Sequence, residues 1–271
     1  MPVLKTDSDS IHYAESGRGD PVLLAHSGGY TSTQWRGVMD ALQARFRLLA
    51  IDLQGCASTP LWSGARGMTL ADEAELVRAL ARSAGRPVHL VGHSYGGAVA
   101  LRSALNDPAP YASLTLLEPI CFNLLRQAGE TTAHTELLTE LEAFVRTARA
   151  GDPATAMGRF VEYWNARPGM WASLAEEVRA ELTARVPAML HQCHALKYDD
   201  TKVGELSSIA LPTALMEGEA TIEPMRRLMA VVARHMPTAG RIALPRLRHM
   251  APATHPQPVA EALGAWLTAT S

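Results

Sequence analysis

Cysteine is scarce in this chain, and long apolar runs are missing. The three cysteines, Cys56, Cys121 and Cys193, are odd in number and widely spaced. This pattern argues against a disulfide framework and favours a reducing compartment. The first ten residues contain no apolar run of signal-peptide length, and no later segment approaches the roughly 18 apolar residues of a membrane-spanning helix. We therefore expect a soluble protein of the cytoplasm.

Strong charge and cofactor-binding motifs are also missing. The net charge is −2, without long runs of one sign. Electrostatics thus gives no reason to expect nucleic acid or an anionic membrane as a partner. The chain has no glycine-rich phosphate loop and no nucleotide-binding fingerprint. The segment His191-x-Cys193-His194 lacks the spacing and the number of ligands of a zinc site. We expect a small-molecule substrate, no cofactor and no metal; the oligomeric state stays open, with a homodimer as one alternative.

The length and pattern of the chain indicate one large α/β domain. Its 271 residues are 47% hydrophobic, enough for a sizeable core with an inserted subdomain. Apolar runs of strand length alternate with amphipathic helical stretches, which is typical of a mainly parallel sheet covered on both faces. The expected strands are 10–16, 22–25, 46–53, 88–91, 112–117, 212–217 and 241–244. Residues 120–205 instead predict several helices and no strand, as in a lid. The expected helices are 131–149, 153–166, 171–185 and 187–197.

The strongest chemical signal is Gly92-His93-Ser94-Tyr95-Gly96, which lies between an expected strand and an expected helix. This is the context that a G-x-S-x-G motif requires, and it makes Ser94 the candidate nucleophile. The turn is so tight that the residues two before and two after the serine must lack bulk. At the start of the helix, the backbone N–H of Tyr95 is one candidate donor to an oxyanion.

A second glycine-bearing loop follows the expected strand 22–25. Its sequence is His26-Ser27-Gly28-Gly29. Backbone at such a loop can approach a substrate closely, so we assign the second oxyanion donor to the N–H of Gly28, with Gly29 as the alternative. His26 is a less favoured candidate for the base, because a histidine at a strand end more often orients a loop.

Together these motifs resemble the α/β-hydrolase fold enzymes over nearly the whole chain. The third matching motif is His249-Met-Ala-Pro252, which precedes the last expected helix. The resemblance implies an eight-stranded, mostly parallel sheet flanked by helices, with an inserted helical cap. The core would comprise 1–119 and 206–271, and the cap 120–205. It also implies a triad in the order serine, acid, histidine, with His249 as general base; His255 is the weaker alternative.

The acid departs from the commonest pattern of that family. Most members carry an aspartate after the penultimate strand, where this chain has Thr221. Other relatives carry the acid one strand earlier, and Glu118 occupies that position. A carboxylate there can still hold the imidazole, because geometry and not sequence position matters. We assign the acid to Glu118, with Glu219 and Glu223 as alternatives.

These residues predict a serine hydrolase that cleaves a carboxylic ester or lactone of a small hydrophobic molecule through an acyl-enzyme on Ser94. Carbon–carbon bond hydrolysis, other cofactor-free chemistry on the same triad, or a non-catalytic ligand-binding protein on this scaffold remain alternatives. Substrate contacts are expected from loop residues and cap aromatics. The expected contacts are Gly29, Tyr30, Trp62, Phe122 and Trp164.

Overall fold

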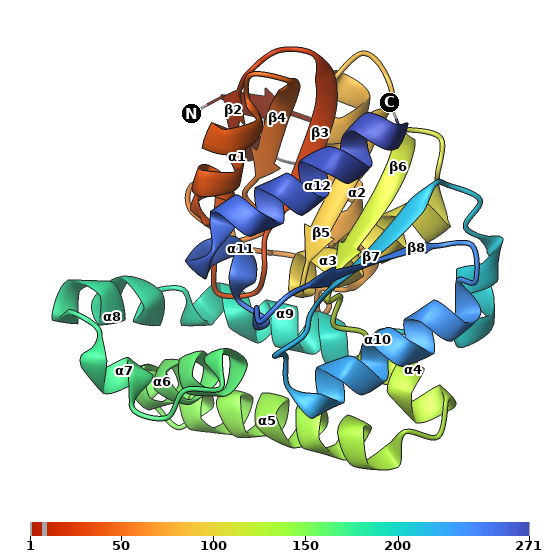
Figure 1. Ribbon diagram of the computed structural model, residues 1–271. Helices are drawn as coiled ribbons and strands as arrows, with labels where there is room; N and C mark the ends of the chain where they lie inside the picture. The colour runs from red at the N-terminus through yellow and green to blue at the C-terminus, as the bar shows by residue number, and fades with distance from the viewer. Residues whose placement is uncertain (1, 7–9, 271) are drawn as a thin grey trace.

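The computed structural model describes residues 2–6 and 10–270. These residues contain an eight-stranded sheet with the strand order β1-β2-β4-β3-β5-β6-β7-β8 (Figure 1). β1 pairs antiparallel with β2, and β2 with β4, while the remaining neighbours pair in parallel. The expected eight-stranded, mostly parallel sheet is confirmed. The strands are β1 Val3–Lys5, β2 Ser10–Ser16, β3 Asp20–Ala25, β4 Phe46–Ile51, β5 Val88–His93, β6 Tyr111–Leu117, β7 Thr213–Gly218 and β8 Gly240–Leu244.

Side-chain alternation along the central strands builds one core on each face of the sheet. Val22 and Leu24 of β3 pack on one face, with α1 and α12. Leu23 and Ala25 point to the other face and pack with α2, α3 and α10. Burial on both faces explains why these strands are continuous apolar runs. The flanking helices are α1 Arg36–Leu42, α2 Leu70–Ser83, α3 Tyr95–Asn106, α10 Glu223–His235 and α12 Pro256–Thr270, with the short η1 Ser32–Trp35 and α11 Ala251–Thr254.

Between β6 and β7 the described chain is helical. Figure 1 shows most of these helices below the sheet, with α5 at the bottom of the view. Part of this segment has a small apolar cluster of its own, which includes Phe144, Met157 and Met189. The expected helix 171–185 is divided in two, because Leu174 has an extended backbone. The elements are α4 Phe122–Gln127, α5 Thr131–Arg149, α6 Pro153–Asn165, α7 Met170–Ser173, α8 Glu176–Thr183, α9 Val186–Lys197 and η2 Val203–Ser208.

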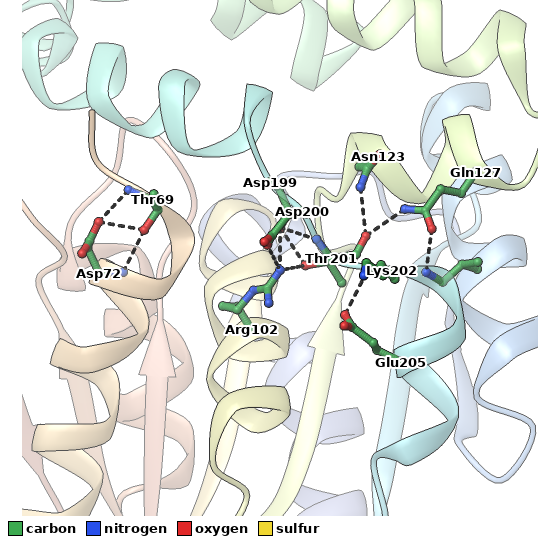
Figure 2. A network of polar contacts seen from close by, with 11 residues as sticks. Thr69, Asp72, Arg102, Asn123, Gln127, Asp199, Asp200, Thr201, Lys202 and Glu205 are labelled. Carbon is green, nitrogen blue, oxygen red and sulfur yellow. Dashed lines mark hydrogen bonds and ion pairs between the residues drawn. The ribbon is translucent and has the colours of Figure 1, made fainter. Parts of the chain in front are cut away.

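A polar network fixes the point where this helical segment returns to the sheet. In Figure 2, Arg102 on α3 reaches the loop after α9. Its Nη2 lies 3.2 Å from Asp199 Oδ1, 2.6 Å from Asp200 Oδ1 and 2.7 Å from Thr201 Oγ1. The Asp199 side chain is 1% exposed, so its charge depends on this guanidinium for compensation. The network therefore ties the helical segment to the helix that follows Ser94.

We expect Arg102→Met to lower the free energy of unfolding by about 3 kcal/mol, because Asp199 would keep a buried charge without its partner. Arg82→Met is the matched control. It breaks an ion pair with Asp107 in which the arginine side chain is 62% exposed, and should cost less than ~1 kcal/mol. Urea unfolding with linear extrapolation measures both. Equal losses in the two variants would contradict the structural role given to Arg102.

No helix among the described residues is both long enough and apolar enough to span a membrane.

Candidate active site

The sharp turn between β5 and α3 presents Ser94 in a strained conformation, with φ 56° and ψ −117°. Such a backbone costs on the order of 1–3 kcal/mol outside glycine and persists only where its surroundings hold it. The Ser94 N–H donates to the Leu117 carbonyl at 3.0 Å, and the Ser94 carbonyl accepts from the Ile120 N–H at 3.1 Å. A Cβ on Gly92 would lie 2.3 Å from the Gly96 carbonyl oxygen. The glycines are therefore required by the turn that presents the serine.

Three side chains from distant parts of the chain meet at this turn. Ser94 Oγ lies 2.9 Å from His249 Nε2, and His249 Nδ1 lies 2.5 Å from Glu118 Oε2. All three are buried, with Ser94 the most exposed at 5%. A carboxylate only accepts hydrogen bonds, so Nδ1 carries the proton and Nε2 accepts from the serine hydroxyl. The structure thus joins the predicted nucleophile, base and acid in one hydrogen-bonded chain.

Glu118 follows β6 and is held by two further hydrogen bonds. Its Oε1 accepts from the Gly218 N–H at 2.8 Å, and its Oε2 accepts from the Thr221 hydroxyl at 2.8 Å. Thr221 is the residue that stands where the commonest pattern has the acid. Here it orients the carboxylate that comes from the neighbouring strand. These two hydrogen bonds hold the Glu118 carboxylate in the orientation in which Oε2 meets Nδ1 of His249.

The alternative candidates lie elsewhere. Glu219 Oε2 accepts from the Arg246 N–H at 3.3 Å. Glu223 is exposed at the start of α10 and forms ion pairs with two arginines of that helix. His255 is exposed, with Nδ1 2.9 Å from the Thr254 hydroxyl. Among the described residues, Glu118 is the carboxylate bonded to His249.

The glycine loop after β3 lies against the serine turn. A Cβ on Gly28 would lie 3.7 Å from Tyr95 Cβ, and both residues line the same cavity as Ser94. The His26 carbonyl accepts from the Gly96 N–H at 3.0 Å, which fastens this loop to α3. Gly29, the alternative donor, has φ 72°, and its carbonyl accepts a hydrogen bond from Arg185 Nη1 at 2.8 Å. The position of Gly28 suits the predicted oxyanion donor, whose role stays a prediction.

His26 orients its loop in the way expected of a histidine at a strand end. Its Nδ1 lies 2.8 Å from the Ser27 carbonyl, and its Nε2 accepts from the Leu53 N–H at 3.1 Å. Complete burial lowers the pKa of His26 to about 4. A neutral imidazole with both nitrogens engaged does not serve as the base.

Two residues contact His249 from outside the hydrogen-bonded chain. His93 Nε2–H donates to the His249 carbonyl at 2.9 Å, and burial lowers the pKa of His93 well below its usual value. The Trp164 ring lies 4.5 Å from the His249 ring, centroid to centroid. His93 is the variable residue before the serine in the motif, and the motif alone predicts no role for it. Trp164 was expected only as a substrate contact.

A cavity of about 60 Å³ opens over Ser94 beneath the helical segment. Its lining is mostly apolar and includes Phe122 and Trp164, as expected for substrate contacts. Trp62 lies in a different hollow, where its ring packs against Arg66. Tyr30 packs against Arg185, 6.0 Å from ring centroid to guanidinium carbon. The structure therefore places two of the predicted aromatic contacts in the cavity and two outside it.

Glu73 on α2 is a buried carboxyl that sequence reasoning did not single out. Its Oε1 accepts from the Tyr95 hydroxyl and its Oε2 from the Gln54 N–H, both at 3.1 Å. Burial raises the pKa of Glu73 from 4.5 to about 8. The residue therefore carries a proton at neutral pH, and it anchors the side chain next to the candidate nucleophile.

Glu73 should make stability fall as pH rises from about 5 to 8. In this range the folded protein keeps a proton that the unfolded chain has released, so rising pH lowers the free energy of unfolding. Glu73→Gln removes that contribution. The variant should gain on the order of 3 kcal/mol relative to the wild type between pH 5 and 8. Urea unfolding at both pH values measures the difference, and parallel pH profiles for the two proteins would refute the assignment.

Among residues 2–6 and 10–270, no three His, Cys, Asp or Glu side chains gather into a group able to hold a metal ion.

Comparison with known proteins identifies the family of this chain. The model of the alpha/beta hydrolase family matches residues 22–262. A pimeloyl-[acyl-carrier protein] methyl ester esterase of Aeromonas salmonicida is 27% identical over 262 residues, covering 93% of this chain and 97% of that protein. One from Methylococcus capsulatus is 39% identical over 102 residues, a match that covers only 38% of that protein's length.

The solved structures show the same fold. An enol-lactonase from Burkholderia xenovorans superposes with a TM-score of 0.79 at 16% identity, covering 98% of this chain and all of that chain. At 16% identity, this structural similarity shows a shared fold and nothing about function. The family match, in contrast, extends over most of the sequence. The chain belongs to the alpha/beta hydrolase family, which supports its assignment as a hydrolase.

Proposed function

We propose that the protein hydrolyses a carboxylic ester or lactone of a small, largely apolar molecule through an acyl-enzyme on Ser94. One observation carries the proposal: the hydrogen-bonded chain from Ser94 through His249 to Glu118 ends at an apolar cavity. A serine hydroxyl is a weak nucleophile until a neighbouring base takes its proton. An apolar cavity suits an uncharged carbonyl substrate.

In the first half of the reaction, His249 Nε2 takes the proton of Ser94 while Oγ bonds to the carbonyl carbon. The carbonyl oxygen becomes an oxyanion, which the N–H groups of Gly28 and Tyr95 stabilise. Glu118 stabilises the imidazolium through Nδ1–H. The imidazolium then returns its proton to the departing alkoxide as the carbon–oxygen bond breaks. The acyl group remains on Ser94; in a lactone, the leaving alcohol stays attached to it.

In the second half, His249 takes a proton from water, and the hydroxide attacks the acyl carbon. The second oxyanion collapses, Ser94 leaves with the proton from the imidazolium, and the carboxylic acid is released. Every proton is carried by the same imidazole. The scheme draws on protein groups alone and uses no metal or organic cofactor.

A serine-directed fluorophosphonate probe tests the proposal against a non-catalytic ligand-binding role. Covalent labelling of the wild type, together with hydrolysis of 4-nitrophenyl butyrate, is the expected result. Ser94→Ala should lose both. Absence of labelling and of turnover in the folded wild type would refute the proposed hydrolysis.

A further inference from the structure

One polar side chain that lines the cavity is not a member of the proposed triad. Gln192 lies on α9 and is 3% exposed. It lines the cavity over Ser94 together with Gly28. A glutamine buried among apolar groups normally finds partners for both ends of its amide. The Oε1 atom of Gln192 is buried and has no hydrogen-bond partner.

The contacts of Cys56 indicate which end of the Gln192 side-chain amide points toward Cys56 and which end lies beside Gly28. Amide oxygen and nitrogen are assigned from their hydrogen-bond network. Cys56 Sγ lies 3.8 Å from the Gln54 carbonyl, an acceptor for the thiol hydrogen. The sulfur is then left to accept, and Gln192 Nε2 lies 3.6 Å from it. The NH₂ end therefore points toward Cys56, and Oε1 lies beside Gly28, which lines the cavity as well, as an acceptor without a partner.

This acceptor lies beside the place where a substrate carbonyl would bind. Oε1 is 3.3 Å from the position that a Cβ on Gly28 would take, and Tyr95 Cβ is 3.7 Å from the same position. Gly28 and Tyr95 are the two proposed oxyanion donors. A carbonyl held by their N–H groups would bring its neighbouring atoms next to Gln192.

Three other polar side chains that line the cavity have partners already. Glu140 and Arg159 form a two-point ion pair, with distances of 2.7 and 2.8 Å. The Tyr163 hydroxyl donates to Glu136 at 2.9 Å. Among the described residues that line the cavity, Gln192 supplies a buried side-chain oxygen that has no hydrogen-bond partner.

We infer that Gln192 determines specificity by accepting a hydrogen bond from an O–H or N–H on the substrate atom next to the scissile carbonyl. The inference rests on the proposed hydrolysis and narrows its substrate to acyl groups with an α-hydroxyl or α-amino donor. A buried acceptor left unpaired is destabilising, because it has lost its hydrogen bonds to water and gained none in return. A substrate with the donor recovers this energy, while an isosteric substrate with a methyl group does not.

Two lactones of nearly equal shape test the inference. We expect the wild type to show a kcat/KM for α-hydroxy-γ-butyrolactone about 10-fold to 100-fold above that for α-methyl-γ-butyrolactone. Gln192→Leu should bring the two values within ~3-fold of each other, since leucine has no acceptor. Gln192→Met serves as a second variant if leucine impairs folding. Met189→Leu, on the same helix and in the same cavity, should keep the wild-type ratio.

Calorimetric binding in the Ser94→Ala background separates this inference from the proposed reaction. The hydroxy lactone should bind more tightly than the methyl lactone, and adding Gln192→Leu should abolish this difference in affinity.

Selective binding without hydrolysis by the wild type would refute the proposed reaction but uphold the role of Gln192. Equal rates and affinities for the two lactones, or a preference that survives Gln192→Leu, would overturn the inference. An equal loss on both lactones would also overturn it, since that indicates a role in oxyanion binding. Failure to bind or hydrolyse either lactone would overturn the inference, whereas the proposed hydrolysis is judged separately by turnover of 4-nitrophenyl butyrate.

Discussion

Ser94→Ala should lower kcat for ester hydrolysis by ~10⁶-fold, the size of loss seen when a hydrolase of this type loses its nucleophile. The structure gives the reason, because His249 Nε2 faces Ser94 Oγ at 2.9 Å and would have no proton to take from alanine. The residual rate would come from substrate binding and the oxyanion donors. Steady-state kinetics with 4-nitrophenyl butyrate measures the loss.

Ser113→Ala is the matched control for that variant. Ser113 is also a buried serine bonded to a histidine, with Oγ 2.8 Å from His89 Nδ1, but it lies within β6. It should retain wild-type kcat. Thermal unfolding would establish that both variants are folded. Comparable turnover in Ser94→Ala and Ser113→Ala would show that the serine turn is structural only.

Glu118→Gln should lower kcat by about 10⁴-fold. An amide in this position can turn its NH₂ toward Nδ1 of His249, which forces the imidazole proton onto Nε2. The ring then cannot accept the proton of Ser94. Because the amide oxygen can still accept a hydrogen bond from Gly218 or Thr221, the variant should fold. Kinetics at saturating substrate separates this loss from a change in KM.

Glu219→Gln and Glu223→Gln are the controls, because these were the alternative acids. Glu219 bonds the Arg246 N–H, and Glu223 forms surface ion pairs on α10. Each control should stay within ~3-fold of wild-type kcat, since neither carboxylate is bonded to His249. A large loss in Glu219→Gln with full activity in Glu118→Gln would reverse the assignment.

The elements that the sequence predicted well are those with an unambiguous pattern. The strand 10–16 and the helix 131–149 have the observed bounds, since apolar periodicity and local turn residues agree there. β1, of three residues, and α4, of six, were missed. Segments so short contain too few residues for a periodic pattern of apolar side chains to be recognised. Their structure is decided by tertiary contacts.

The candidate site divides in the same way. The serine turn is a local motif, because steric limits act between residues close in sequence, such as Gly92 and Gly96. The choice of Glu118 came from a family resemblance. Its physical support is a hydrogen bond from the hydroxyl of Thr221, in the loop after the neighbouring strand β7, and this bond joins residues 103 positions apart. Gln192 lies on a helix without a motif, and only the packing of that helix over the glycine loop reveals its free acceptor.

The most direct test of the central claim is mass analysis of the enzyme after rapid acid quenching during turnover of 4-nitrophenyl acetate. We expect the peptide containing Ser94 to gain the mass of one acetyl group before steady state, and we expect no such gain in Ser94→Ala. Sustained hydrolysis by the wild type with no acetylated Ser94 at any quench time would contradict it, because water would then attack the substrate without a covalent intermediate.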